Sequence, residues 1–319
     1  MKVAIDASPL VQPYGGIARY TTELHRALAR RFPDDEFYLQ QPGARLWWPI
    51  GLPAALKRSS ADLFHGTDFS VPYRKVCAGV MSIHDLSPWR AGFASETSNR
   101  VRRRTPWLLR LGLATMVVTL TEAVRRQVIE HFHLDPGQVA SVHPAAGHEF
   151  QPVACPCEGY FLFVGTKGVR KNLDVILEAR RALGVELWLA GRGHDTVEQG
   201  VRLLGPVDDK DLPALYSGAE ALLFPSFYEG FGLPVVEAMR CGTPVIASRD
   251  PALLEVSDGA ALHADAADVR AWVEAMRAVR DNREEWSARG LRRAGEFTWE
   301  KTATNMRAVY QEAICRHAR

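Results

Sequence analysis

The sequence predicts an α/β protein made of two doubly wound domains, each with a mostly parallel sheet. Short apolar runs rich in β-branched residues alternate with amphipathic segments, which is the pattern of βα units around a parallel sheet. These runs fall into two sets, separated by a polar, proline-containing stretch at about 151–158. We therefore expect an N-terminal domain over 1–152 and a C-terminal domain over 153–298.

The expected strands are six apolar runs in each half of the chain. In the N-terminal half they are KVAID (2–6), EFYLQ (36–40), DLFHG (62–66), GVMSIHD (79–85), MVVTLTE (116–122) and QVASVHP (138–144). In the C-terminal half they are YFLFVGT (160–166), VELWLAG (185–191), VRLLGPV (201–207), EALLFPS (220–226), PVIAS (244–248) and AALHA (260–264). A helical segment over 299–319 follows the last run, and we expect it to pack back on the N-terminal domain.

Composition and charge narrow the class of function. The 319 residues suffice for two domains that each bury a core, and 47% are hydrophobic and 24% charged. The formal net charge of +2 gives no reason to expect nucleic acid as a partner. The chain opens as an apolar strand and has no uncharged apolar stretch of about 18 residues, so we expect a cytoplasmic protein that does not span a membrane. Five scattered cysteines, among them Cys155 and Cys157 without a second pair, predict no metal site.

A glycine-rich loop interrupts the segment FYEGFGLPVVEAMRCGTPVIA, residues 227–247. Leu233 and Pro234 suit the start of a helix, because proline at the first helical position gives up an N–H that would be unpaired anyway. The backbone N–H groups of Gly230, Phe231 and Gly232 would then lie at the positive end of this helix, where glycine lets a ligand approach the main chain. The loop therefore predicts an anion site.

Two glutamates, Glu229 and Glu237, bracket this loop. Each carboxylate can accept hydrogen bonds from hydroxyl groups on its side of the anion. A phosphate with hydroxyl-bearing groups on both sides describes a nucleotide sugar, with the hexose at Glu229 and the ribose at Glu237. For either glutamate alone, the alternative is stabilisation of the helix dipole.

A basic pair in VGTKGVRKNL, residues 164–173, follows an expected strand and opens an expected helix. Arg170 and Lys171 would lie where two cations neutralise a diphosphate leaving group. The alternative is a solvated helix N-terminus, but cations are disfavoured at that end.

The N-terminal domain offers two further candidates. Gly15 and Gly16 follow the first strand and precede a helical segment, so they supply main-chain donors at a helix start. His84 closes the run GVMSI at the carboxyl end of a strand, where ligands bind in open α/β sheets. A lone histidine is more often structural, but this position favours contact with a ligand.

Taken in order, these motifs resemble the retaining glycosyltransferases of glycosyltransferase family 4, which are marked by a Glu-x7-Glu element like Glu229 to Glu237. The resemblance covers nearly the whole chain. It rests on GGIARY (15–20), HGTDFSVP (65–72), SIHDLSP (82–88), VGTKGVRKNL (164–173), LAGRG (189–193), LPALYSGAEALLFPS (212–226) and EGFGLPVVE (229–237). It implies the GT-B fold, with two Rossmann-like domains facing across a cleft.

The resemblance also implies a reaction. A hexose would move from a nucleoside diphosphate sugar to a hydroxyl of a glycan or lipid-linked acceptor, with retention and without a metal ion or other cofactor. His84, Arg170, Lys171 and Glu229 would act on the donor, and Gly15 and Gly16 would reach toward its diphosphate. Thr166 stands where many family members have an arginine. Since HDLSP and the GT-xxx-RKN element resemble bacterial mannosyltransferases of polysaccharide assembly, the first donor to expect is GDP-mannose.

Three other functions stay open at this stage. A sugar-nucleotide epimerase would share the fold and the diphosphate site, and a non-catalytic protein could bind the same ligand. A nicotinamide oxidoreductase is disfavoured, because neither Gly191-Arg192-Gly193 nor Gly230-Phe231-Gly232 has a third glycine three positions on.

One segment departs from the balanced charge of the chain. From Trp89 to Arg110 there are six arginines and one glutamate, interleaved with aromatic and leucine side chains. A basic, aromatic-bearing surface can lie on anionic lipid, so the Arg90–Arg110 region is a candidate for peripheral membrane contact. The alternative is a solvated helix whose apolar face packs inward.

Overall fold

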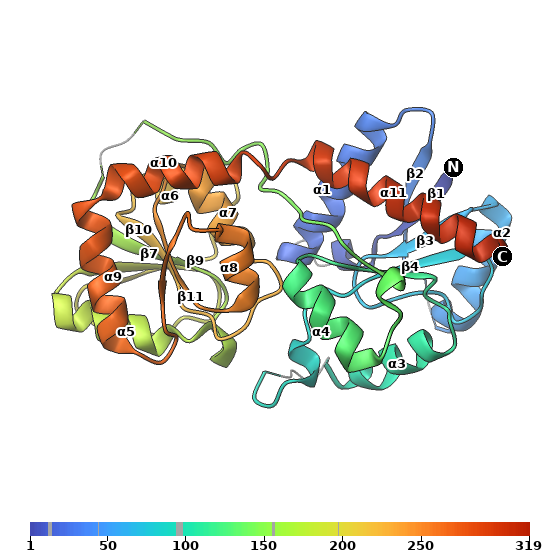
Figure 1. Ribbon diagram of the computed structural model, residues 1–319, viewed down its shortest axis with the longest axis horizontal. Coiled ribbons are helices and arrows are strands. Elements are labelled where there is room, and N and C mark those ends of the chain that lie inside the picture. The colour runs from blue at the N-terminus through green and yellow to red at the C-terminus, as the bar shows by residue number, and fades with distance from the viewer. Residues whose placement is uncertain (12–14, 44, 94–97, 155–156, 197) are drawn as a thin grey trace. The chain divides into compact units, whose positions relative to one another are not determined.

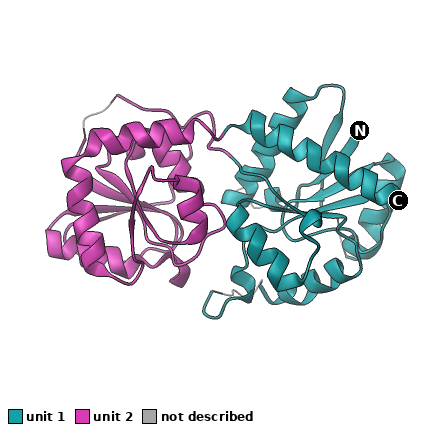
Figure 2. Cartoon of the chain, in the orientation of Figure 1, with its two compact units in different colours: residues 1–144, 298–319 teal, residues 145–297 magenta. Residues whose placement is uncertain are grey.

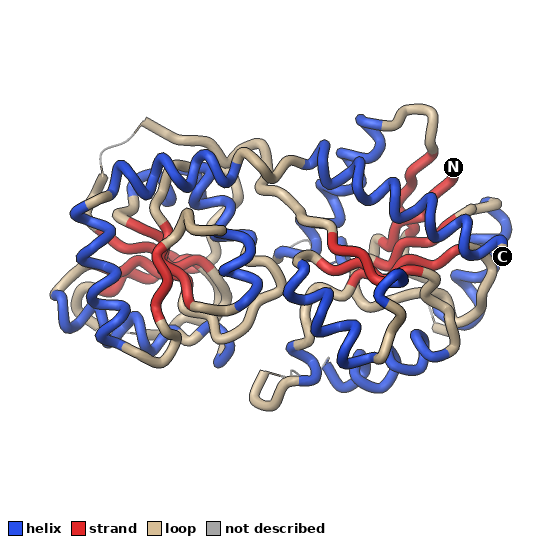
Figure 3. The backbone as a smooth tube through the Cα atoms, in the orientation of Figure 1, coloured by secondary structure: helices blue, strands red, loops and turns tan. Residues whose placement is uncertain are grey.

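The computed structural model describes residues 1–11, 15–43, 45–93, 98–154, 157–196 and 198–319. Within these residues the chain forms two compact units, one of Met1–Pro144 with Thr298–Arg319 and one of Ala145–Phe297 (Figure 1, Figure 2). Each unit is a six-stranded parallel sheet with helices around it (Figure 3). The predicted α/β class with two doubly wound sheets is therefore confirmed. Cys155, part of the cysteine pair considered above, lies outside the described residues.

The sheet of the first unit has the strand order β2-β1-β3-β4-β5-β6, and its order reverses between β1 and β3. Every predicted strand of this half is present: β1 Lys2–Asp6, β2 Glu36–Gln40, β3 Leu63–Gly66, β4 Ala78–Ser82, β5 Met116–Thr119 and β6 Val139–Ser141. The helices between them are α1 Gly16–Arg31, α2 Leu52–Ser59, α3 Ser98–Arg110 and α4 Glu122–Phe132.

The sheet of the second unit has the order β12-β11-β10-β7-β8-β9. Numbered within the unit this is the Rossmann order 3-2-1-4-5-6, whose switch point lies between β7 and β10. The strands are β7 Tyr160–Val164, β8 Glu186–Ala190, β9 Val201–Gly205, β10 Ala221–Phe224, β11 Val245–Ser248 and β12 Leu262–Ala264. The helices are α5 Leu173–Leu183, α6 Leu212–Gly218, α7 Leu233–Arg240, α8 Pro251–Ser257, α9 Val269–Asp281 and α10 Arg283–Ala294.

The core of the second unit forms where α5 and α9 cover one face of its sheet. Phe161 and Phe163 of β7 pack with Ile176 of α5 and Trp272 of α9, and all four are fully buried. The Trp272 indole Nε1–H donates to the carbonyl of Asp265 at 2.9 Å, so its one polar atom is satisfied. This packing fixes the end of β7, from which one of the site loops leaves.

The last helix, α11 Trp299–Ala318, packs on α1 and β4 of the first unit (Figure 2). Its Tyr310 hydroxyl hydrogen-bonds to His65 Nδ1 at 2.8 Å, and His65 Nε2 bonds to Ser82 Oγ at 2.9 Å. Burial, with a smaller contribution from His84, lowers the pKa of His65 to about 3, so the ring is neutral at pH 7. A buried chain of hydrogen bonds therefore connects α11 to β3 and β4.

Among the described residues, no helix is both long enough and apolar enough to cross a membrane.

We expect Tyr310→Phe to destabilise the protein, because it leaves a buried ring nitrogen of His65 without a partner. An unsatisfied buried polar group costs about 1–3 kcal/mol. Urea unfolding at pH 7 measures the change. Tyr38→Phe is the matched control, since its hydroxyl bonds Ser59 Oγ in a partly exposed position. Equal losses in the two variants would contradict the role given to the buried chain.

Candidate active site

The candidate site lies where the loops after β7 and β10 meet, at the switch point of the second sheet. The Phe227 N–H donates to the carbonyl of Arg170 at 2.9 Å, and the Asn172 side chain donates to the carbonyl of Pro225 at 3.1 Å. Ligands of open α/β sheets bind at this point, outside the carboxyl ends of the strands. Residues that are far apart in sequence therefore lie together at the position where folds of this kind bind ligands.

Glu229 forms an ion pair with each of the two predicted cations. Arg170 Nη1 lies 2.8 Å from Glu229 Oε2, and Lys171 Nζ lies 2.7 Å from Glu229 Oε1. Arg170 also donates to the carbonyl of Tyr228 at 2.7 Å. The structure thus brings three of the predicted site residues into one cluster. The sequence had placed the cations on a diphosphate and Glu229 on a hexose, and it did not predict their mutual pairing.

The electrostatics of this cluster favour a carboxylate with two cations around it. The Glu229 side chain is only 8% exposed, whereas Arg170 and Lys171 keep 26% and 15% of their side-chain surface. Burial raises the pKa of Glu229, but the charges of Lys171 and Arg170 outweigh burial and hold the pKa below its usual range. Glu229 is therefore ionised at neutral pH. Two positive charges against one negative charge leave the cluster with an excess of one positive charge.

Tight backbone contacts hold the loop after β7 in place. Asn172 has a left-handed backbone (φ 51°), and its side chain donates to the carbonyls of Pro225 and Ala266. Asparagine tolerates this conformation better than most residues. At Gly191 (φ 140°) a Cβ would lie 2.0 Å from the Gly165 carbonyl oxygen, so only glycine fits there. Thr166, which follows Gly165, is exposed near the start of this loop.

The glycine loop leads into α7 as the sequence predicts. Gly230, Phe231 and Gly232 are buried, and Leu233 is half-buried. Gly232 has φ 86°, and its carbonyl accepts from the Val235 N–H at 2.9 Å. α7 starts at Leu233 with a proline in its first turn and ends at Arg240. The helix start predicted from Leu233 and Pro234 is thus confirmed.

Glu237 is a buried carboxylate inside α7, with 1% of its surface exposed. Its Oε2 accepts a hydrogen bond from the Tyr216 hydroxyl of α6 at 3.0 Å. The sequence analysis did not identify Tyr216. It belongs to the LPALYSG segment quoted for the family resemblance, which was the available signal.

Asp250 is a carboxylate that the sequence analysis missed. It caps α8, two residues after the end of β11, and its Oδ1 accepts from the Ala252 N–H at 3.0 Å. Burial, with a smaller contribution from the charge of Glu229, raises the pKa of Asp250 to about 6, although the hydrogen bond from the Ala252 N–H lowers it in part. The Asp-Pro pair after an apolar run was a capping signal in the sequence.

The N-terminal candidates belong to the first unit. Gly15 (φ 110°) immediately precedes α1, which begins at Gly16. His84 follows β4, its Nε2 lies 2.6 Å from the Thr67 carbonyl oxygen, and its ring lies edge-on to Tyr20. Asp68, which sequence reasoning missed, is close enough that the charge of His84 lowers its pKa, although burial, the larger effect, raises it. In the part of the chain that the structure describes, no group of three or more His, Cys, Asp or Glu could hold a metal ion.

Comparison with known sequences agrees with the resemblance to glycosyltransferases. Residues 158–282 match the family described as Glycosyl transferases group 1, and this range contains the whole β7–α7 site. The chain is 31% identical to O-antigen chain mannosyltransferase B from Escherichia coli, over 98% of this chain and 100% of that protein. It is 32% identical to the MMP α-(1→4)-mannosyltransferase of Mycolicibacterium hassiacum, over 70% of this chain and 58% of that protein.

Solved structures share the fold at low sequence identity. Sucrose-phosphate synthase from Thermosynechococcus elongatus matches with a TM-score of 0.79 at 19% identity, over 98% of both chains. HepE from Anabaena, in complex with UDP and glucose, matches with a TM-score of 0.73 at 15% identity, over 98% of this chain and 100% of that one.

We expect Glu229→Gln to lower the free energy of unfolding by about 2–4 kcal/mol at pH 7, since removing one partner of a buried pair leaves its cations uncompensated. The folded pKa of Glu229 lies below the usual 4.5. Its contribution is therefore complete above about pH 4.5 and is lost as the pH falls through the folded pKa. Urea unfolding of wild type and variant across this range tests both statements.

Glu285→Gln serves as the control, because Glu285 pairs with Arg289 on an exposed helix face. Exposed pairs contribute less than about 1 kcal/mol. If Glu229→Gln lowered the free energy of unfolding at pH 7 by no more than this control does, the stabilising role given to Glu229 would be wrong.

Proposed function

The chain belongs to the group 1 glycosyltransferases and is a hexosyltransferase of the GT-B fold, and we propose that it transfers mannose from GDP-mannose with retention and without a metal ion. The acceptor is a hydroxyl of a glycan or of a lipid-linked glycan. The observation that carries the proposal is the Arg170–Lys171–Glu229 cluster at the switch point of a Rossmann-ordered sheet.

Two kinds of evidence support the donor. The relatives from E. coli and M. hassiacum are named as mannosyltransferases, which favours mannose. HepE, which shares the fold, was crystallised with UDP and glucose, so this fold accepts a nucleoside diphosphate together with a hexose. The guanosine base is inferred from the mannosyl group alone.

The cluster suits a diphosphate for an electrostatic reason. With the donor bound, Arg170 and Lys171 would take phosphate oxygens as acceptors, and the oxygens of Glu229 would then be available to hexose hydroxyls. Before binding, Glu229 holds both cations in place, so little reorganisation is needed when charge develops on the leaving group. The N–H groups from Gly230 to Leu233 add partial positive charge at the start of α7.

Glu237 is assigned to the ribose hydroxyls. It lies one turn inside α7, beyond the glycine loop, whereas Glu229 precedes the loop. The Tyr216 hydroxyl fixes one oxygen of its carboxylate. A carboxylate held in this way offers a rigid acceptor for hydroxyl groups.

Retention follows most simply from attack on the face that the phosphate leaves. Glu229 is occupied by two cations and has a lowered pKa, which suits a sugar ligand better than a nucleophile. In the proposed step the bond from the anomeric carbon to the phosphate oxygen breaks while the acceptor oxygen bonds to the same face. The acceptor proton passes to the departing phosphate. Arg170 and Lys171 supply the charge stabilisation that a divalent cation supplies in other transferases.

The proposal predicts that the purified protein releases GDP from GDP-mannose in the presence of EDTA and a panel of alkyl glycosides. NMR of the product should show an α-mannosidic bond. UDP-glucose, UDP-GlcNAc and dTDP-rhamnose are the comparison donors. A β-linked product would overturn retention, and loss of activity in EDTA would overturn metal independence. Conversion of the sugar nucleotide to an epimer without acceptor would favour an epimerase instead.

We expect Lys171→Ala to lower kcat by about 10²–10³-fold, the scale of losing one preorganised stabilising group. Lys167→Ala is the matched control, because Lys167 lies on the same loop but pairs with Asp195 in an exposed position. It should stay within about twofold of wild type, as an exposed ion pair contributes little. Circular dichroism melts confirm that both variants fold. A kcat near wild type for Lys171→Ala would remove this residue from the mechanism.

A further inference from the structure

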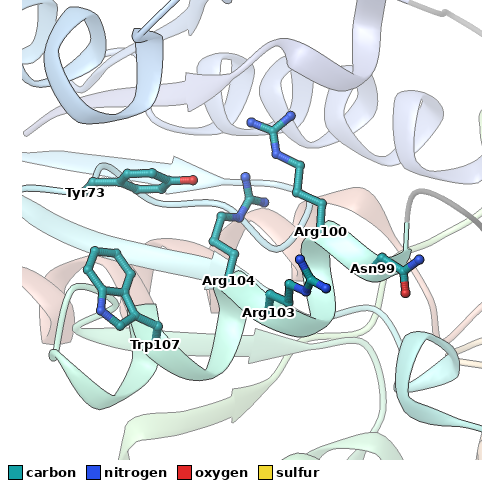
Figure 4. Close-up of a pocket in the computed structure, with 6 residues that line it drawn as sticks. All are labelled: Tyr73, Asn99, Arg100, Arg103, Arg104 and Trp107. Carbon is teal, nitrogen blue, oxygen red and sulfur yellow. The ribbon is translucent and has the colours of Figure 1, made fainter.

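The first unit contains a pocket of about 510 Å³ against α3 (Figure 4). Its lining residues are Tyr73, Asn99, Arg100, Arg103, Arg104 and Trp107. The three arginines and Trp107 are spaced i, i+3, i+4 and i+7, so they share one face of the helix. Thr105, Leu108 and Leu109 are buried on its other side. The inward apolar face, which was the alternative considered for this segment, is thus present in α3, and the face with the arginines lines a pocket.

None of the described residues that line the pocket is acidic, although the charge of Arg104 also acts on Asp6 and Asp68 nearby. Within the described residues, neither Arg100 nor Arg103 pairs with an acidic side chain. Figure 4 shows the side chains of Arg100 and Arg104 pointing away from α3, to the side of the helix on which Tyr73 lies. Arg104 Nη2 donates to the Phe69 carbonyl at 2.9 Å, but its buried Nε has no hydrogen-bond partner among the residues described. Guanidinium groups in this arrangement match the oxygens of a phosphate.

The wall beside these cations is aromatic. The rings of Tyr73 and Trp107 meet edge to face at 5.7 Å, and Trp107 is 48% exposed. The Tyr73 N–H donates to the carbonyl of Trp48, in the π-helix Trp47–Gly51, and the Arg104 guanidinium lies 5.5 Å from the Trp48 ring. A half-exposed tryptophan next to arginines suits a ligand in which an anion adjoins a sugar ring or a hydrocarbon chain.

Arg104 connects the pocket to the carboxyl edge of the first sheet. Its partner, Phe69, has a left-handed backbone (φ 48°), a strained conformation for a bulky residue. The neighbouring Asp68 has its pKa raised by burial and lowered in part by the charges of His84 and Arg104. The pocket, Asp68 and His84 therefore lie at the same edge, where ligands of such sheets bind.

We propose that this pocket binds a phosphate or diphosphate group of the acceptor, so that the acceptor is a phosphoryl-linked glycan rather than a free glycan. The inference rests on the proposed function, because it names the acceptor class of the same reaction. The volume lies within the range of about 300–1,000 Å³ found for ligand pockets and accommodates the anion with an adjoining ring.

The test compares two acceptors that differ only in the phosphoryl group. One is an alkyl mannoside, and the other is the same mannoside joined to its alkyl chain through a diphosphate. Wild type should have a KM about 10–100-fold lower for the diphosphate-linked acceptor, the scale of one or two charge-assisted hydrogen bonds. Arg100→Ala/Arg103→Ala should lose most of this preference while keeping kcat and GDP affinity.

Arg102→Ala/Arg110→Ala is the matched control. It removes the same charge from exposed positions of α3 that do not line the pocket. It should keep the preference for the diphosphate-linked acceptor. An equal loss in both double variants would show that general charge, not the pocket, attracts the acceptor, and would overturn the proposal.

Two further measurements separate the remaining outcomes. The diphosphate-linked acceptor should quench the fluorescence of Trp107 when GDP is present at saturation, and this reports binding even if no transfer occurs. The Trp107→Phe variant should lose this quenching, which shows that the signal comes from Trp107. Absence of transfer from every donor would thus refute the proposed function, while absence of quenching would refute the pocket. Flotation with phosphatidylcholine or phosphatidylglycerol vesicles tests membrane lipid as the source of phosphate. If the pocket variant loses only vesicle binding and keeps its acceptor KM, the proposal is wrong.

Discussion

The pairing of one buried carboxylate with two cations organises the second unit. Glu229 lies in the loop after β10, and Arg170 and Lys171 lie in the loop after β7. The two strands are neighbours in the sheet, with Leu222 opposite Leu162. Burying a carboxylate is costly, and two ion pairs, one of which is also a hydrogen bond from Lys171, offset that cost. The strand order brings the loops after β7 and β10 close together, and the ion pairs between them hold them there. The glycine loop and α7 continue directly from Glu229, so their position depends on the same contact.

Much of the fold could be predicted from the sequence because its signals are local. Each strand is a short apolar run, and proline and glycine mark the ends of α7. The candidate residues could be selected for the same reason, since a residue just after a strand lies at the carboxyl edge of the sheet. The side-chain partners could not be predicted. Lys171 and Glu229 are 58 positions apart, and Tyr216 reaches Glu237 from another helix.

The basic segment shows a second limit of sequence reasoning. Its arginine content was evident, but charge alone could not distinguish a lipid-facing surface from a solvated helix. The buried positions of Thr105, Leu108 and Leu109 fix the rotation of α3, and that rotation decides which arginines share a face with Trp107. The second wall, Tyr73, comes from a loop before β4, which no periodicity in α3 could reveal.

The two proposed anion sites differ in a way that fits their roles. In the second unit Glu229 pairs with Arg170 and Lys171. Under the proposed function it would compete with the diphosphate for these cations, lower the diphosphate affinity and pair with them again when the product leaves. An enzyme whose turnover includes release of a nucleoside diphosphate would benefit from such a competitor, since product release is rate-limiting in many enzymes. Among the described residues, no carboxylate lines the α3 pocket, and Arg100 and Arg103 are exposed, so their contacts with a bound anion would be open to water and salt. Charges of that kind are screened beyond about 10 Å at 0.1 M salt. Acceptor capture at α3 should therefore weaken with ionic strength much more than donor binding does, because the donor cluster is largely shielded from solvent.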